Sequence, residues 1–551
     1  MNSLKYIFYF ITIFLLFLTC KKREKLDLST IQTYHHLAIP LVNAQIGIEE
    51  LLKKDTGGLV TTNPQTGEIL LAYESSAMSI DASEIIDVTD QTFSASVSPG
   101  SIPIIPLGSS QDTIISINQS FAVPNSEELD SIDFSSGVFN YSITNNLRHE
   151  VEVTIKIPSL VSKSSPISLP ISYSDLTIVD SIGHPTGNVK TGQTALSNYI
   201  LDLTKGNLGY NQIVVEFIVR INGSGASVSA SEDLNIVLSM NGLEFARIDG
   251  DLKYQKFDLG SSPVTLSIFN ISDGAFDFSL TNPKIEHTIV NSFGFSANMG
   301  MDSMYYEDLA GIKIDDIKYD STGLSPQIAP FYFPTIQQPT NAFDSATTLI
   351  FMDNTNSSIS DLINATPKTI ISKPFVEVNP DQTASNNNYI LSSSKISVST
   401  EISLPLEGYA EGWIMRDTIP FNAKVDELFS SETSIDSAII KFTTTNYFPL
   451  DVKIDLILLD STSTTIDTIA DSELIIASGV IDANGKITTA QAVPTKLPCD
   501  GTCVDNLNNT RFIILRLSIG TTGVSSQESV KIYDDYKIEL DIALLISGRM
   551  F

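Results

Sequence analysis

The sequence predicts an all-β protein made of tandem antiparallel β-sandwich modules, Ig-like in their expected strand arrangement, behind a lipoprotein signal peptide. Two observations predict the sandwiches. Apolar and polar residues alternate over many short runs, as in Val151 to Ile157 and Val452 to Leu456, and this period of two buries one face of a strand. Prolines and glycines interrupt the runs at short intervals, as between Pro103 and Pro124, which favours antiparallel strands joined by turns.

The first twenty residues have the order of an export signal. Lys5 precedes the uncharged apolar run Tyr6–Leu18, and Thr19 and Cys20 follow it. The run is shorter than the roughly 20 residues that cross a bilayer as a helix, so we expect a signal peptide over 1–19 rather than a permanent span. The cysteine directly after a small residue resembles a lipobox, with Phe17 where leucine is more usual. We therefore expect lipid attachment at Cys20; the alternative is a simple signal peptide with an incidental cysteine.

The cysteine count agrees with this expectation. The chain has three cysteines, and lipidation of Cys20 accounts for the odd one. Cys499 and Cys503 flank Asp500-Gly501, a pair that readily forms a turn and would bring the two sulfurs together. A local disulfide is predicted, and a reduced pair stays open as the alternative. Zinc is not expected, because no histidine lies near the pair to complete about four ligands.

Charge excludes one class of partner. The 551 residues include 33 basic and 64 acidic side chains, for a net charge of −31. Nucleic acid is not an expected partner, because binding phosphates requires a basic face. The chain is long enough for about three domains. The apolar stretch Leu540–Ile546 is too short to span a membrane and is expected to be a buried final strand.

An internal repeat is the strongest feature of the body. Phe139–Asn145, Phe276–Asn282 and Ile440–Asn446 share a strand pattern that ends in Thr-Asn. The outer two regions match at three further places, with a nearly constant offset: Asp112-Thr-Ile with Asp417-Thr-Ile, Ile213–Phe217 with Phe512–Arg516, and Asp233–Leu238 with Asp535–Leu540. This predicts a duplicated module. The alternative is that strand-turn-strand patterns recur in any β protein.

These observations predict the following layout. A signal peptide (1–19) is followed by a basic tether (20–35), a leading segment with a short helix at Gly47–Lys54 (36–89), and three β-sandwich modules at 90–250, 251–396 and 397–551, the third repeating the first.

Two segments carry a resemblance to a known group. The run from His36 to Leu52 just after the signal, and the run from Leu404 to Trp413 followed by Asp417, resemble uncharacterised large outer-membrane lipoproteins of the Bacteroidota. The resemblance extends over most of the chain. It implies an outer-membrane address and implies no activity.

A second pattern has two interpretations. Aspartate followed by Ser or Thr and then an apolar residue or Thr is more frequent than the composition predicts, and it resembles an O-glycosylation acceptor of Bacteroidota envelope proteins. The other interpretation is a turn that opens a strand. The pattern begins at Asp112, Asp130, Asp180, Asp302, Asp320, Asp344, Asp417, Asp436, Asp460 and Asp467.

No catalytic motif is found in the sequence. The histidines are scattered without a Gly-x-Ser-x-Gly elbow, and His287 is expected to be a packed or surface side chain on a strand. The carboxylate pairs Asp315-Asp316 and Asp534-Asp535, and Asp249-Gly-Asp251, are expected in solvated turns. We therefore expect no enzyme activity, no metal and no cofactor.

The expected function is a non-catalytic interaction or scaffold module, held by its lipid at the outer membrane and bound to a protein partner of the cell envelope. The periplasmic face is slightly favoured, because Lys21 to Lys25 is mostly basic whereas surface-export tags are usually acidic. One alternative is a glycan-binding accessory lipoprotein of a nutrient-uptake system, with Trp413 as the possible glycan contact. The other is a hydrolase built from distant carboxylates.

Overall fold

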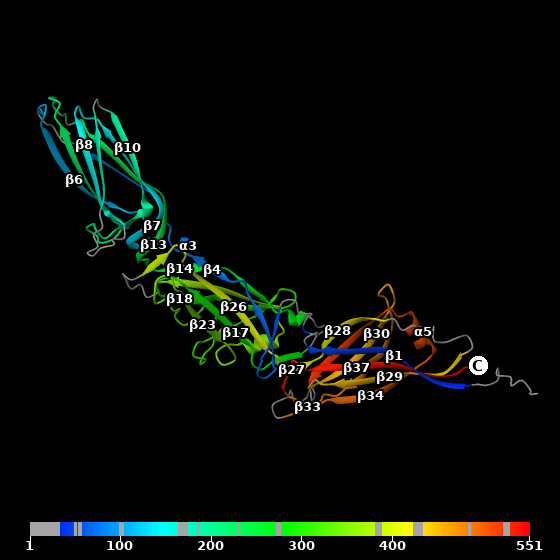
Figure 1. The fold of residues 1–551 in the computed structure, drawn as a ribbon. Coiled ribbons are helices and arrows are strands. Elements are labelled where there is room, and N and C mark those ends of the chain that lie inside the picture. The colour runs from blue at the N-terminus through cyan, green and yellow to red at the C-terminus, as the bar shows by residue number, and fades with distance from the viewer. Residues whose placement is uncertain are drawn as a thin grey trace, which may run out of the picture.

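The computed structural model shows a bent rod of three β-sandwiches placed end to end (Figure 1). It describes residues 33–48, 52, 58–97, 104–163, 175–183, 187–229, 231–270, 277–380, 388–421, 433–482, 486–521 and 529–550. The predicted signal peptide, Cys20 and most of the tether lie outside these residues. The described tether residues, from Thr33, already belong to the first strand.

The sandwich at the end of the rod remote from the C-terminus is called the distal sandwich. One of its sheets has the order β5-β13-β7-β10 and the other β6-β12-β8-β9, all antiparallel, with short β11 joining β7 to β8. The strands are β5 (Gln91–Val97), β6 (Ser110–Ser120), β7 (Glu128–Asn145), β8 (Glu150–Ser162), β9 (Asp175–Ile182), β10 (Asn188–Ala195), β11 (Tyr199–Asp202), β12 (Gln212–Asn222) and β13 (Leu234–Asp251).

The middle sandwich repeats this plan with two of its strand positions divided. Its sheets have the orders β3/β4-β26-β17-β23 and β14/β15-β24-β18-β19, with β2 at the edge beside β3 and β22 beside β18. The strands are β2 (Leu59–Thr62), β3 (Ile69–Glu74), β4 (Met78–Asp81), β14 (Gln255–Asp258), β15 (Ser262–Thr265), β17 (Lys284–Asn291), β18 (Ala297–Glu307), β19 (Lys313–Asp316), β22 (Phe331–Tyr332), β23 (Ala346–Met352), β24 (Thr369–Val378) and β26 (Lys395–Pro405). Two short strands, β20 (Lys318–Tyr319) and β21 (Gln327–Ile328), form a separate hairpin.

The proximal sandwich carries the C-terminus. Its sheets are β1-β37-β29-β34 and β28-β35-β30-β31, with a small hairpin of β32 (Val480–Ile481) and β33 (Ile487–Thr489) beside them. The strands are β1 (Thr33–Gly47), β28 (Trp413–Pro420), β29 (Thr433–Asn446), β30 (Leu450–Leu459), β31 (Thr465–Ile476), β34 (Gln491–Cys499), β35 (Phe512–Thr521) and β37 (Lys537–Met550).

All three sandwiches share one strand order. If the strands of each are counted from first to eighth, one sheet reads 1-8-3-6 and the other 2-7-4-5, which is the double Greek key of a jelly roll. The predicted all-β class and antiparallel sandwich are confirmed. The Ig-like strand arrangement is not found, because here the first strand pairs with the last, whereas in an immunoglobulin domain it pairs with the second. Alternation in a sequence identifies strands but does not say which strands pair.

The three sandwiches are nested rather than consecutive. Along the chain, the first strand of the proximal sandwich (β1) comes first, then that of the middle sandwich (β3 and β4), and then that of the distal sandwich (β5). The remaining strands complete the distal sandwich first, then the middle one and finally the proximal one. The segment 36–89 is therefore not a separate leading segment, since it supplies the first strands of two sandwiches. The boundary expected at 396/397 falls within β26, which belongs wholly to the middle sandwich.

Helices are short and few among the described residues. They are α3 (Ala82–Ile85), α4 (Ile359–Asn364) and α5 (Gly501–Asn509), with 3₁₀ turns at Leu196–Asn198 and Ser267–Asn270. The helix expected at Gly47–Lys54 is described only at Ile48 and Leu52, which are helical and buried, while Gly47 ends β1.

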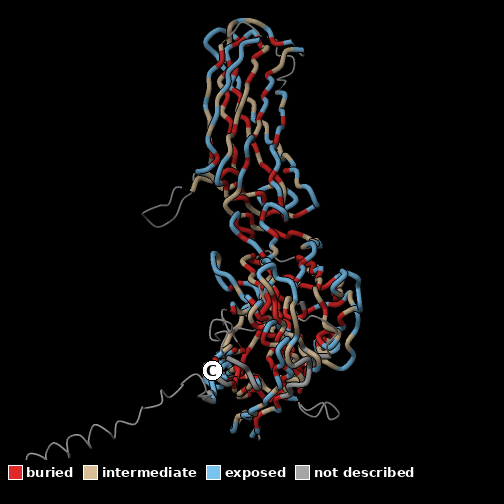
Figure 2. The backbone as a smooth tube through the Cα atoms, turned by 90° about the vertical axis from the view of Figure 1, so that its right-hand side faces the viewer, coloured by how far each residue is buried: buried red, intermediate tan, exposed pale blue. Residues whose placement is uncertain are grey.

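The core of each sandwich lies between its two sheets. Buried residues alternate with exposed and intermediate ones along the strands, so each strand turns one face into the core (Figure 2). At the end of the third strand the core of the outer two sandwiches holds a fully buried asparagine, Asn145 or Asn446. Each side chain accepts the amide two residues later and donates to the carbonyl four residues later, at 2.8–2.9 Å. This bonding fixes the turn into the fourth strand.

The sequence repeat lies on equivalent strands in the outer sandwiches. The four matched pairs of segments lie on the second, third, seventh and eighth strands, and each pair occupies the same strand number in the distal and the proximal sandwich. The middle copy was placed wrongly at Asn282, which is exposed and lies in a turn. The buried asparagine of the middle sandwich is Asn291, at the end of its third strand, and it accepts the amide of Phe293 at 2.9 Å.

Candidate functional site

The joint between the proximal and middle sandwiches is a small sheet of its own. Its central strand β27 (Glu407–Glu411) pairs with β16 (Asp277–Leu280) from the middle sandwich and with β36 (Val530–Lys531) from the proximal one. Hydrogen bonds therefore cross the joint from one sandwich to the other. This pairing resists bending more than a single covalent linker would.

Close packing at Gly408 holds this sheet together. A Cβ atom at Gly408 would lie 1.9 Å from the carbonyl oxygen of Ser279, so only glycine fits there. Beside it lies an apolar cavity of about 40 Å³, whose lining includes Leu280, Leu406 and Phe448 from both sandwiches. The cavity has an apolar lining, and its volume lies below the range of small-molecule sites.

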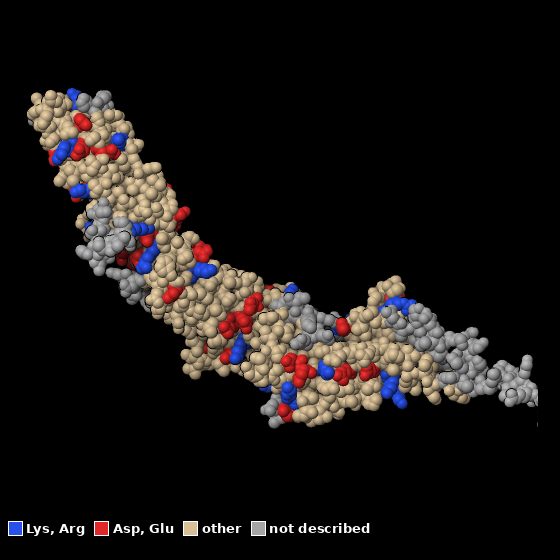
Figure 3. Space-filling view, in the orientation of Figure 1, with Lys and Arg blue, Asp and Glu red and all other residues tan. Residues whose placement is uncertain are grey.

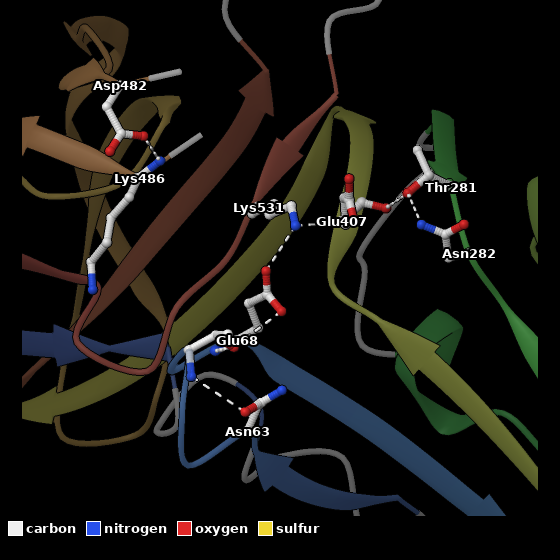
Figure 4. Close-up of polar contacts among 9 residues, drawn as sticks. Asn63, Glu68, Thr281, Asn282, Glu407, Asp482, Lys486 and Lys531 are labelled. Atoms are coloured by element: carbon white, nitrogen blue, oxygen red, sulfur yellow. Dashed lines mark hydrogen bonds and ion pairs between the residues drawn. The ribbon is translucent and has the colours of Figure 1, made fainter. Parts of the chain in front are cut away.

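An ion group closes the outside of the same joint (Figure 4). Lys531 contacts Glu68 at 2.8 Å and Glu407 at 3.6 Å, so one ammonium group joins the middle sandwich, the linker strand and the proximal sandwich. The hydrogen bond from Lys531 lowers the pKa of Glu68, and the same bond raises the pKa of Lys531. The groups are about one third exposed, so the contact mainly fixes geometry.

The joint between the middle and distal sandwiches is also hydrogen-bonded. Strand β25 (Tyr389–Leu391) comes from the middle part of the chain and pairs with the end of β13. The guanidinium of Arg247 lies over the ring of Tyr389, 4.6 Å from its centroid, and also binds Asp249. Asp251 bonds Asn379 at 3.0 Å. The chain thus crosses each joint twice and pairs across it.

The loops at the free end of the distal sandwich bring Ser224 and His149 together. The hydroxyl oxygen of Ser224 lies 3.1 Å from Nδ1 of His149. However, the amide of Ser224 donates to that same nitrogen, and the hydroxyl donates to the carbonyl of Arg148. The nitrogen is therefore already occupied as an acceptor and the hydroxyl proton points elsewhere. This arrangement ties two loops together and lacks the geometry of a nucleophile activated by a base.

The predicted cysteine pair is close enough to bond. Cys499 and Cys503 are joined by a disulfide with Cα atoms 5.3 Å apart. The connection is not the expected Asp-Gly turn, because Asp500 caps α5 by accepting the amide of Cys503 at 2.9 Å. The disulfide therefore links the end of β34 to the first turn of a helix.

The other predicted contact residues are described only in part. Cys20, the expected lipid attachment site, lies outside the described residues. Trp413, the possible glycan contact, begins β28 opposite Ile519, and its side chain lies outside the description. Among the ten aspartate patterns, seven lie within strands and three, at Asp320, Asp344 and Asp460, lie in turns.

The carboxylate pairs singled out in the sequence lie in different parts of the described fold. Asp315 and Asp316 lie on β19, not in a turn, and Asp316 binds Lys313 at 2.6 Å. The expected solvated turn at Asp249-Gly-Asp251 is wrong, because these residues end β13 and help to form a joint.

His287 is packed, as expected. Its Nδ1 lies 2.9 Å from the hydroxyl of Thr400, and burial lowers its pKa to about 4. Within the described ranges, no group of three or more His, Cys, Asp or Glu side chains could hold a metal ion. None of the helices described is long and apolar enough to cross a membrane.

Sequence reasoning missed the residues that form the joints. Gly408, Lys531 and Tyr389 carry no motif, since each acts through a partner far away in the chain. Asn291 did have a signal, because an apolar residue follows it by two positions, as it follows Asn145 and Asn446.

No protein-family model matches the chain, and no curated protein matches it in sequence. A secreted protein from Parabacteroides distasonis is 14% identical, with a TM-score of 0.27 over 53% of this chain and 82% of that one. Structures of infectious bursal disease virus, from the Gt and Gx strains, are 10% and 9% identical, with TM-scores of 0.15 and 0.14. They cover 91% and 92% of this chain and 86% of each viral chain. Likenesses this distant carry no argument about function.

Proposed function

We propose that this protein is a non-catalytic, lipid-anchored scaffold of the outer membrane, of the Bacteroidota lipoprotein kind that its sequence resembles. It holds its distal sandwich away from the bilayer for a partner of the cell envelope. The observation that carries the proposal is the position of the start of β1, which the nested arrangement places at one end of the rod. Thr33 pairs with Met550, so β1 starts beside the end of β37, at the end of the rod opposite the distal sandwich (Figure 1). A lipid on Cys20 would attach the rod at this end.

The length of the rod follows from its strands. β1, β26 and β13 have 15, 11 and 18 residues and lie one after another along the rod. At about 3.3 Å per residue they span on the order of 140 Å. The two hydrogen-bonded joints support a rod of defined length rather than a string of independent domains.

The test places fluorophores at the two ends of the rod. Lipidated protein is reconstituted on vesicles that carry an acceptor dye, with a donor at Ser227→Cys in a distal loop or at Asn509→Cys in the proximal sandwich. We expect strong energy transfer from position 509 and little from position 227. Equal transfer from both would contradict the proposal, as would membrane binding by the Cys20→Ala variant.

A further inference from the structure

The outer face of one distal sheet has no charged residue over twelve neighbouring positions. Three rows cross β10, β7, β13 and β5 in register. They consist of Val189, Thr144, Asn235 and Ser96; Thr191, Ser142, Val237 and Ser94; and Gln193, Asn140, Ser239 and Thr92. Ten of the twelve carry a hydroxyl or an amide and two are valines. We call this surface the neutral face.

The matching faces of the other two sandwiches are charged. The two sandwiches can be aligned by superposing their buried asparagines, Asn446 on Asn145, and following the strand registers. In this alignment the proximal sandwich has charged residues where the distal one has neutral ones: Lys441 for Asn140, Lys496 for Gln193, Glu539 for Asn235 and Asp541 for Val237. In the middle sandwich Glu286 matches Asn140 and pairs with Glu401. The fold therefore does not require a neutral surface at this place.

The opposite face of the distal sandwich is charged as well. Arg220 binds Asp112 at 2.9 Å, and Lys156 lies 3.7 Å from Glu216. Acidic and basic side chains gather in small mixed groups along the rod, with uncharged stretches between them (Figure 3). The chain as a whole has a net charge of −31. The lack of charge on the neutral face is therefore a feature of this one sheet and does not follow from the composition of the chain.

The neutral face contains a groove of about 380 Å³. Its lining includes Asn140, Ser142, Thr191, Gln193 and Ser239, from three adjacent strands. Among the described residues, the side chains of Ser142, Thr191, Gln193 and Ser239 take part in no hydrogen bond. Hydroxyl and amide groups both donate and accept, so the groove offers both kinds of partner without a charge. Its volume lies within the range of small-molecule sites.

We propose that this groove binds a neutral glycan. A sugar chain presents hydroxyl groups that donate and accept, so it can satisfy the groove without desolvating a charge on either side. Anionic glycans and nucleic acids find no cation here, and an apolar peptide would leave the hydroxyl and amide groups unpaired. Within each row the side chains repeat about every 4.8 Å from one strand to the next, which gives an extended chain repeated hydrogen-bonding positions. The proposal goes beyond the scaffold function, because it names what the distal sandwich would hold.

The test compares three variants on an array of neutral and acidic glycans, followed by affinity electrophoresis in the neutral polysaccharides that bind. Asn140→Lys places in the groove the residue that the proximal sandwich has at this position as Lys441, so the fold tolerates it. The double variant Asn140→Ala, Gln193→Ala removes amide groups without adding charge. Asn118→Lys makes the same change on the charged opposite face and is the matched control.

We expect the unaltered protein to bind at least one neutral glycan and no acidic one. Binding should weaken at least tenfold in Asn140→Lys and in the double variant, and should be unchanged in Asn118→Lys. Circular dichroism should give the same melting curve for all four proteins. The proposal is overturned if no neutral glycan on the array binds, or if the control loses binding as much as Asn140→Lys does. It is also overturned if gel filtration shows a dimer that Asn140→Lys dissociates, because the face would then be a contact between two copies.

Discussion

Replacing Asn446 with alanine should destabilise the proximal sandwich strongly. The side chain is fully buried; it accepts the amide of Phe448 at 2.8 Å and donates to the carbonyls of Leu450 and Ala477 at 2.8 and 3.1 Å. Alanine leaves one buried N–H and two carbonyls without these partners. A buried unsatisfied group costs about 1–3 kcal/mol, and a carbonyl costs less than an N–H. We expect a loss of about 3–4 kcal/mol in the free energy of unfolding.

The measurement can be confined to one sandwich. Trp413 is the only tryptophan and lies on β28, so its fluorescence during urea unfolding reports the proximal sandwich. Asn145→Ala removes the same bonds in the distal sandwich and should leave the tryptophan transition in place while lowering the stability seen by circular dichroism. Asn282→Ala, at an exposed turn, should change either signal by less than about 0.5 kcal/mol.

Two results would refute this reasoning. One is a loss below about 1 kcal/mol for Asn446→Ala with an unchanged denaturant slope, since the bonds would then add nothing beyond solvation. The other is an equal shift of the tryptophan transition by Asn145→Ala, because the sandwiches would then unfold as one cooperative unit.

Three further outcomes are expected. Replacing Cys499 and Cys503 by serine opens a very short loop and should lower the stability of the proximal sandwich by about 2 kcal/mol in urea; no change would argue against the disulfide. His287 has a folded pKa of about 4, below its unfolded value of about 6.5. The unfolded chain therefore binds the proton first, and stability that is full above pH 6.5 falls as the pH drops toward 4. Calorimetry should show a loss of about 2 kcal/mol between pH 7 and 5 that is absent in His287→Gln; the same loss in that variant would contradict this cause. Gly408→Ala forces a Cβ against the carbonyl of Ser279 and should broaden the distance distribution between spin labels at Thr347 and Thr488, whereas an unchanged distribution would show that the joint does not depend on this contact.

Local patterns predicted the strands well because the alternation of apolar and polar residues within a strand reflects which of its faces is buried. The alternation from Val151 to Ile157 is a strand with one buried face, and the repeat of Asn145 at Asn446 marks the same turn in two sandwiches. These features depend on neighbours within a few residues, so they can be recognised in the sequence.

Pairing between distant segments could not be predicted in this way. The apolar stretch Leu540–Ile546 predicted the final strand β37, but only the folded chain shows that its partner is β1. The joints depend on contacts such as Lys531 with Glu68, whose members are hundreds of residues apart. The neutral face was missed for a related reason. Its rows run across four strands, and charge along the sequence alone does not show which side chains share a surface.

The nesting sets an order in which the protein can be completed. Only the distal sandwich has all its strands in one unbroken stretch, from β5 to β13, so it can fold while the rest of the chain is still arriving. Among the described strands, β1 of the proximal sandwich is synthesised first, and its partner β37 is synthesised last. Such non-local pairing is slow and leaves sheet edges exposed to other chains in the meantime. The proximal sandwich is therefore the one that most needs a holding chaperone during synthesis. A truncation that removes β37 would leave the distal sandwich intact and would leave β1 without its partner.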